Sequence, residues 1–266
     1  IKLDQINLYN KNGNNLGTLV KSFLFSYNYL GGTNTRMLLS SITESGKNPY
    51  LFEYNDTSNL PKPLTLGIDY WGYWNGKDSN VNLVPNQNYD FNYNSPTAGD
   101  YSTCSASDCT IREPNINYSK KGMLNKITYP TMGYTTFEYE SHDYSKRLES
   151  RSINNYIPTL YDVTSVCGGT RIKTITDHDE TSITIIKNYE YKNDIGISSG
   201  ILLYWPRYIL CWKVPGITVP DQELLFSKAN PTGNISDKSI ITYSQVSEIS
   251  ALNGKKTITY SSFITN

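Results

Sequence analysis

A strand–turn–strand unit recurs along this chain and constrains its fold more than any other feature of the sequence. In the clearest copy, residues 124–129 and 134–139 alternate apolar or aromatic with polar side chains around a turn that holds Pro130 and Gly133. Because successive side chains of a strand point to opposite faces, Ile127 and Tyr129 are expected on one face with Phe137 and Tyr139. Proline and glycine supply the turn conformations. The unit predicts a β-hairpin with one buried, apolar face.

Four other segments repeat this plan, led by isoleucines at positions 6, 42, 175 and 249. Two of them turn at Asn-Gly, which is the strongest short hairpin signal. A lone hairpin cannot bury its apolar face, so consecutive units are expected to pair edge to edge into one continuous sheet. The predicted fold class is therefore all-β, a mostly antiparallel curved sheet built from successive β-hairpins.

Long insertions separate these units, at about 55–117, 141–168 and 192–239, within a single β-rich segment over residues 1–266. Loops held by a rigid scaffold commonly carry function, so specific binding residues are expected there. The third insertion contains the one segment with a helical pattern, Asp221 to Ala229. Since the chain begins at Ile1 without a leader pattern, we interpret it as a fragment or mature segment of a longer chain.

Composition narrows the function classes. The 24 Lys and Arg residues balance 24 Asp and Glu residues, which argues against nucleic-acid binding by phosphate neutralisation. The 23 tyrosines and the scarcity of alanine favour strands over helices. The longest apolar run, residues 201–205, is far shorter than the roughly 20 residues of a membrane-spanning helix. We expect neither a nucleic-acid partner nor a membrane span.

Aromatic side chains cluster in the first insertion, where Trp71, Tyr73 and Trp74 are the candidate ligand-binding residues. Their flat rings suit stacking on sugar rings, with the neighbouring Asp69 and Asn75 available to bind hydroxyl groups. The same rings suit a β-sheet core equally well. The cluster is therefore either a glycan-binding patch or part of the core.

Cysteines permit one favoured cross-link. Four are present, and four cysteines allow three complete pairings. Cys104 and Cys109 lie in a stretch of small polar residues typical of a surface loop, so they are the candidate disulfide in an oxidising compartment. The alternative is a pair of free thiols. The two histidines of the chain do not stand at a zinc-ligand spacing from this pair.

Catalytic signals are weak. A hydrolase using Cys167, Asp177 and His178 is one hypothesis, but the last two lie at a predicted turn, which favours a solvated loop. The other His–acid neighbours, His142 and Asp143, are expected to point to opposite faces of a strand. No glycine-rich phosphate loop, His-Glu-x-x-His motif or calcium loop is present. We expect no enzyme activity, no metal site and no cofactor.

Residues 118–139 resemble one Rhs/YD repeat. The family pattern runs from Tyr-Asp through Gly and Leu into a strand, a Pro/Gly turn and a closing aromatic-x-Tyr-Asp. This copy diverges, because Ser119 and Glu140 stand where Asp is usual and Met123 where Arg is usual. Further segments are similar to parts of large secreted Rhs-like proteins of Bacteroidetes, namely residues 69–77, 112–115, 168–173, 199–202 and 241–246.

This resemblance implies a spiral β-sheet wall in a secreted or cell-surface bacterial protein. Such walls form a shell around a toxic C-terminal domain. The expected function is thus a non-catalytic scaffold or shell segment that encapsulates or displays a toxin or effector domain. Its partner is then the remainder of its own longer chain, including a C-terminal toxin domain. The alternative is an adhesin or glycan-binding module that uses the exposed aromatic patch to contact surface glycans.

Overall fold

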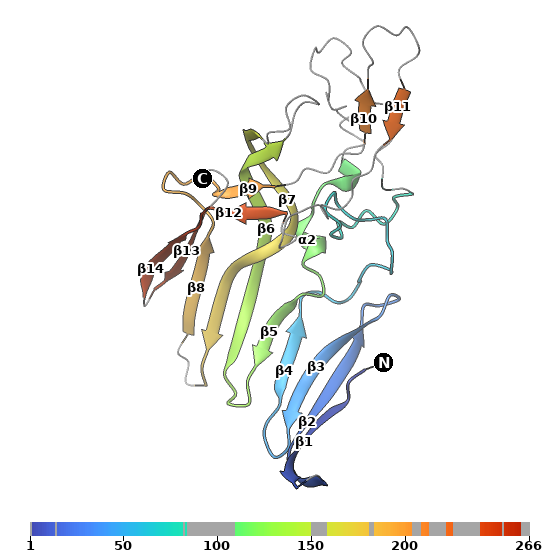
Figure 1. Ribbon diagram of the computed structural model, residues 1–266, viewed down its shortest axis with the longest axis vertical. Coiled ribbons are helices and arrows are strands. Elements are labelled where there is room, and N and C mark those ends of the chain that lie inside the picture. The colour runs from blue at the N-terminus through green and yellow to red at the C-terminus, as the bar shows by residue number, and fades with distance from the viewer. Residues whose placement is uncertain are drawn as a thin grey trace.

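The fold is all-β. The computed structural model describes residues 2–13, 15–81, 83, 110–149, 159–180, 184–203, 209–212, 222–225, 240–251 and 253–261. Within them, the helical elements are a 3-10 turn, η1 (Thr110–Arg112), and a single helical turn, α2 (Ile116–Ser119). No helix of these residues has the length and apolar character needed to cross a membrane. One mostly antiparallel sheet of 12 strands dominates the described chain (Figure 1).

All five predicted hairpins are present. They are β1 (Gln5–Asn12) with β2 (Asn15–Leu30), β3 (Arg36–Glu44) with β4 (Tyr50–Tyr54), β5 (Leu124–Thr128) with β6 (Tyr134–Glu149), β7 (Thr159–His178) with β8 (Thr184–Glu190), and β13 (Gln245–Ser250) with β14 (Gly254–Thr259). Each hairpin also pairs with the next one, in the order β1-β2-β3-β4-β5-β6-β7-β8-β13-β14. The expectation that successive units pair edge to edge is confirmed.

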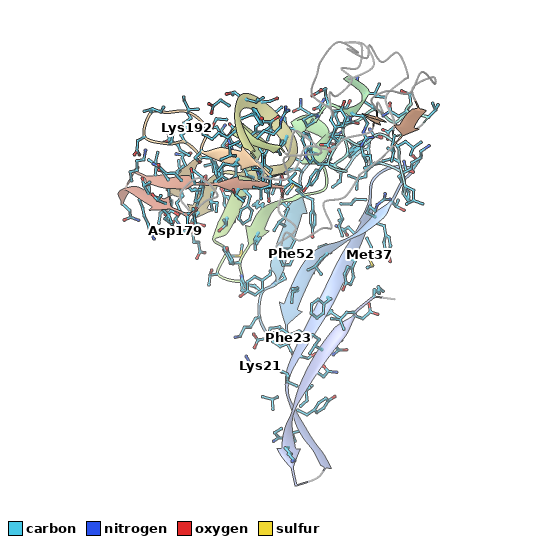
Figure 2. The ribbon with its side chains drawn as sticks, turned by 45° about the horizontal axis from the view of Figure 1, so that its top comes forward. Lys21, Phe23, Met37, Phe52, Asp179 and Lys192 are labelled. Carbon is cyan, nitrogen blue, oxygen red and sulfur yellow. The ribbon has the colours of Figure 1, made fainter. Side chains whose placement is uncertain are left out.

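The two ends of this sheet differ. Because the strands alternate in direction, the tight turns within the five hairpins all lie at one end, which we call the hairpin end. The connections between consecutive hairpins lie at the other end, which we call the insertion end (Figure 1). Figure 2 shows Asp179, which follows β7 at the hairpin end, and Lys192, which follows β8 at the insertion end. Segments far apart in the sequence are thereby collected at one end of the sheet.

An apolar ladder runs across one face of the sheet, and we define it as Phe25, Ile42, Phe52, Ile127, Phe137 and Ile175. Phe25 lies opposite Ile42, Phe52 opposite Ile127, and Phe137 opposite Ile175.

The expectation that this face is buried is wrong, since every ladder residue is half-buried. Most contacts between the described elements are between strands that pair in a sheet. The exception is the contact of α2 with β7. Figure 2 shows the strands that carry Phe23, Met37 and Phe52 as a single layer. Because no second layer of the described residues packs on this face, the ladder side chains shield one another but stay partly exposed to water.

The fully buried core lies instead at the insertion end. Two short strands pair with each other, β9 (Gly200–Leu202) in the third insertion and β12 (Ile241–Tyr243) just after it, and β9 also pairs in parallel with β6. The core cluster consists of Tyr144, Cys167, Leu202 and Ile241, with Trp71, Val163, Ile240 and Tyr243 packed against it. The core therefore consists of side chains from β6, β7, β12 and the first and third insertions.

Segment 141–168, which we expected to be an insertion between hairpins, belongs largely to the strands β6 and β7. Residues 141–149 belong to β6 and residues 159–168 to β7, and their pairing continues to Glu149 opposite Thr159. This extension gives Tyr144 and Cys167 apolar partners from the insertions, which a solvated loop would not provide.

The helix predicted for Asp221 to Ala229 is wrong where the structure describes it. Gln222–Leu225 form strand β11, which pairs antiparallel with β10 (Ile209–Trp212) in a separate two-stranded sheet. Pairing with another strand satisfies the backbone groups of this segment, and such a partner overrides local helix propensity. The rest of the predicted helix lies outside the described residues.

Candidate functional site

Two glycines of β7 let the first insertion approach the sheet closely. A Cβ atom at Gly168 would lie 2.4 Å from Oδ2 of Asp69. A Cβ at Gly169, whose φ is +90°, would lie 3.0 Å from the Tyr73 ring. The Cys167-Gly168-Gly169 run is thus a docking surface for the turn that holds Asp69 and Tyr73. We call the insertion end of β6 and β7, with the insertion residues that contact it, the junction.

Arg171 is the centre of a charged network at the junction. Its Nε donates to Oε1 of Glu140 at 2.7 Å, and its Nη1 donates to Oδ1 of Asp143 at 2.9 Å and to the hydroxyl of Tyr243 at 2.8 Å. The guanidinium also lies over the Tyr191 ring, 4.2 Å from its centroid. The Arg171 side chain is only 9% exposed. The Arg171 guanidinium therefore ties β6 and β7 to Tyr191 and Tyr243, which flank the third insertion.

His142 belongs to the same network and is neutral. Its Nδ1 lies 2.8 Å from the hydroxyl oxygen of Tyr243. Burial, aided by the charge of Arg171, lowers the pKa of His142 to about 4. Since that oxygen accepts from Arg171, the tyrosine proton is available for donation to the imidazole. This geometry suits a structural hydrogen-bond relay.

Asp69 is buried at the base of the first insertion. Its Oδ1 accepts the backbone N–H groups of Trp71 and Tyr73, each at 2.9 Å, and its carbonyl oxygen accepts from Nη2 of Arg112 at 2.7 Å. Its Oδ2 has no hydrogen-bond partner in the part of the chain that the structure describes. Burial raises the pKa of Asp69 to about 6. The carboxyl group shapes the aromatic turn and titrates under mildly acidic conditions.

The three candidate ligand-binding residues have different surroundings. Trp71 packs against the core cluster, and Tyr73 is 43% exposed. Trp74 donates from Nε1 to Asp78 at 3.2 Å and meets the Tyr118 ring edge-on at 5.1 Å. Sequence reasoning did not single out Tyr118 for a site, and its place at the start of the Rhs/YD-like repeat was the one available signal.

The residues of the hydrolase hypothesis are not brought together. In the pairing of β6 with β7, Cys167 lies opposite His142. Asp177 and His178 lie opposite Thr135 and Tyr134, near the hairpin end. Ten residues of one continuous strand separate Cys167 from Asp177, which corresponds to about 30 Å. Proton transfer over that distance is excluded, so the hypothesis is wrong.

The described cysteine is not activated. Cys167 is a buried free thiol, and burial, with the nearby charge of Asp69, raises its pKa to about 12. A thiol with that pKa stays protonated at neutral pH and is a poor nucleophile. The candidate disulfide residues Cys104 and Cys109 lie outside the described residues.

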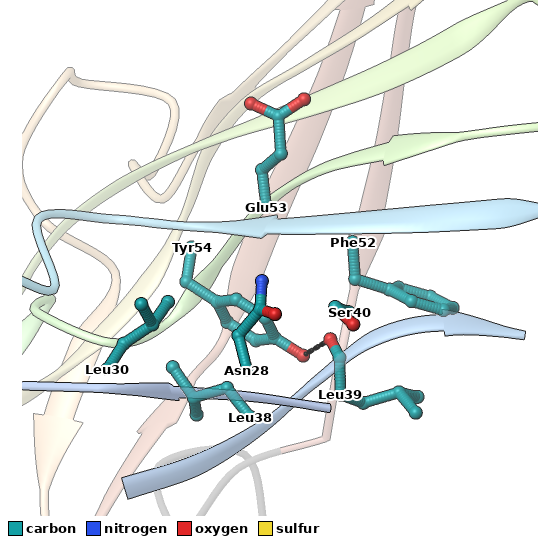
Figure 3. A pocket seen from close by; sticks show the side chains of 8 residues that line it. All are labelled: Asn28, Leu30, Leu38, Leu39, Ser40, Phe52, Glu53 and Tyr54. Atoms are coloured by element: carbon teal, nitrogen blue, oxygen red, sulfur yellow. Dashed lines mark hydrogen bonds between the residues drawn. The ribbon is translucent and has the colours of Figure 1, made fainter. Parts of the chain in front are cut away.

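Two hollows open on the described surface. One of 190 Å³ lies where β3 and β4 separate, and in Figure 3 Tyr54 spans it with a hydrogen bond of 2.7 Å to the Leu39 carbonyl. The other, of 580 Å³, lies beside α2. We call it the α2 hollow, and it is lined by Asn55, Asp56, Asn117, Tyr118, Lys120 and Lys121.

No protein-family model, curated protein or solved structure matches this chain. Any functional conclusion therefore depends on the geometry described above and on the resemblance seen in the sequence.

Proposed function

We propose that this chain is a non-catalytic scaffold, a wall segment of a large secreted or cell-surface Rhs-like bacterial protein that encapsulates or displays a toxin or effector domain. The observation that carries the proposal is the uninterrupted order of the five hairpins in one sheet. A meander of this kind grows by adding hairpins at its edges, as a spiral wall requires.

The direction of the edge strands supports the same function. β1 runs toward the hairpin end and β14 runs away from it, because they are the first and last of ten strands that alternate in direction. A further hairpin of the same kind therefore continues the antiparallel pattern at either edge. The segment is geometrically suited to being one stretch of a longer wall.

The chemistry of the junction also favours a scaffold. Four of its polar side chains, Arg171, Asp143, Tyr243 and His142, hydrogen-bond to one another. Such a network of linked hydrogen bonds rigidifies the elements that it joins. The insertions are thereby held on the sheet, as a load-carrying wall requires.

Imaging by electron cryo-microscopy tests this proposal. The specimen is the whole polypeptide to which this segment belongs, isolated from the culture medium and the cell surface of the producing cells. We expect β1 and β14 to pair with further strands of a wall that surrounds an internal volume. A particle in which both strands remain solvent-exposed edges would overturn the proposal.

Glycan binding through the aromatic patch is the second candidate function, and the exposure of Tyr73 at the insertion end favours it. Trp71 packs on the core cluster, so its replacement tests stability more than recognition. Glycan-array binding that is lost in Tyr73→Ala and kept in Tyr29→Ala, an exposed tyrosine of β2, supports this function. Equal binding by both variants refutes it.

A further inference from the structure

We propose that the α2 hollow binds an acidic saccharide, a hydroxylated sugar ring that bears a carboxylate. This inference is independent of the scaffold proposal, because the hollow is made by the first insertion and α2 whether or not the sheet belongs to a larger wall. Its volume of 580 Å³ is within the usual range for small-ligand sites.

The walls of the hollow are held in place by the backbone. The Asn55 N–H donates to the Met123 carbonyl at 2.7 Å, and the Gly122 N–H donates to the Asn55 carbonyl at 2.7 Å. Asn115 caps the N-terminus of α2, and its side chain accepts from the Asn117 N–H at 3.0 Å. These bonds fix the loop after β4 against the segment after α2, so the site is formed before a ligand arrives.

Tyr118 supplies a rigid aromatic wall. Its ring meets Trp74 edge-on, with the centroids 5.1 Å apart. A Cβ atom at Gly76, whose φ is +79°, would lie 2.4 Å from this ring, so glycine permits the close contact. Lys121 Nζ lies 5.6 Å from the ring centroid. A tyrosine held in this way offers apolar surface and a hydroxyl group, which together suit a sugar.

The charges in the hollow specify an anion. Lys121 is paired with Asp56 at 2.8 Å, and this bond lowers the pKa of Asp56 to about 2, so that pair is ionised and internally neutral. Lys120 has no ion-pair partner within the described ranges. One positive charge is therefore left at the wall of the hollow, and a ligand carboxylate would neutralise it.

The remaining polar groups suit hydroxyls. Asn117 is exposed on the hollow and carries an amide that both donates and accepts, as the two hydroxyls of a sugar require. A peptide could also pair with Lys120 and Asn117, but it lacks the hydroxyl-bearing ring that matches the held Tyr118 side chain. We therefore assign the site to an acidic saccharide over an acidic peptide.

Isothermal titration of the full chain with three probes tests this assignment: trigalacturonate, maltotriose and triglutamate. We expect saturable binding of trigalacturonate, at least tenfold tighter than that of either other probe. Lys120→Gln should weaken it at least tenfold, whereas Lys11→Gln, an exposed lysine of β1, should leave it unchanged. Amide resonances of residues 117–121 should shift on titration.

Loss of folding is controlled with a second variant at the aromatic wall. Tyr118→Ala should abolish binding, and Tyr118→Phe, which keeps the ring, should retain most of it with unchanged thermal unfolding. No saturable binding of trigalacturonate, equal binding of triglutamate, or equal effects of Lys120→Gln and Lys11→Gln would each overturn the inference. None of these outcomes bears on whether the sheet extends into a wall.

Discussion

Arg171 of β7 and Tyr243 of β12 are joined by a hydrogen bond of 2.8 Å from Nη1 to the phenolic oxygen, across 72 residues of sequence. The same guanidinium holds Asp143 of β6. A single side chain thus attaches β12 to the paired strands β6 and β7. The stability of the junction should depend on it.

Replacing Arg171 with glutamine should lower the free energy of unfolding by about 2 kcal/mol, because hydrogen bonds to charged partners are lost in a mostly buried site. Urea denaturation measures this change. The matched control is Lys187→Gln, which breaks a more exposed pair with Asp177 at 3.4 Å and should cost less than about 1 kcal/mol. Equal costs for the two variants would contradict a special role for Arg171.

Asp69 should make stability depend on pH. Its pKa is raised by burial from an ordinary value of 3.8 to about 6, so the native state binds this proton more tightly than the unfolded chain. Asp69 therefore contributes stability that is complete below about pH 4 and is lost as the pH rises through 6. Arg112, whose positive charge lowers the pKa of Asp69, acts on the same titration.

Asp69→Asn removes this titration while keeping an oxygen for the Trp71 and Tyr73 N–H groups. As the pH rises from 4 to 8, the free energy of unfolding of the variant should increase relative to that of the parent chain by up to about 3 kcal/mol. Urea unfolding at pH 4, 5, 6, 7 and 8 gives the comparison. Parallel pH profiles for the two chains would show that Asp69 does not titrate near 6.

Gly168→Ala should destabilise the docking of the first insertion by about 1–3 kcal/mol, because the added methyl group would overlap the Asp69 carboxylate. A double-mutant cycle with Asp69→Ala isolates this contact, and thermal unfolding provides the readout. Gly168→Ala should reduce the stability much less in the Asp69→Ala background, where the carboxylate is absent. A cost that is the same in both backgrounds would place the strain elsewhere.

Cys167 should resist alkylation in the folded protein. Burial keeps its pKa at about 12, so very little thiolate is present at pH 8. Iodoacetamide treatment followed by peptide mass spectrometry should show little modification under native conditions and complete modification in urea. Rapid labelling of the native protein would mean that the junction opens frequently.

The hairpins were predictable because their signals are local. Alternation on both sides of Pro130 and Gly133, and the Asn-Gly pair at Asn253 and Gly254, specify strands and turns within about a dozen residues. Edge-to-edge pairing also followed from the need of each hairpin for a neighbour.

The candidate site was less predictable. His142 and Tyr243 lie 101 residues apart, and no local pattern links them. The helix predicted around Gln222 failed because that segment found a strand partner in β10. The aromatic cluster had two interpretations from sequence, and burial separated them residue by residue: Trp71 joined the core while Tyr73 stayed exposed.

The amino-acid sequence by itself determined that this protein is all-β and built from five hairpins, because strand alternation and turn chemistry act between near neighbours. Tertiary structure alone decided where the buried core lies and which polar groups meet there. The sheet brings every long connection to one end, and there burial, close glycine contacts and the charge of Arg171 assemble residues that the chain keeps far apart.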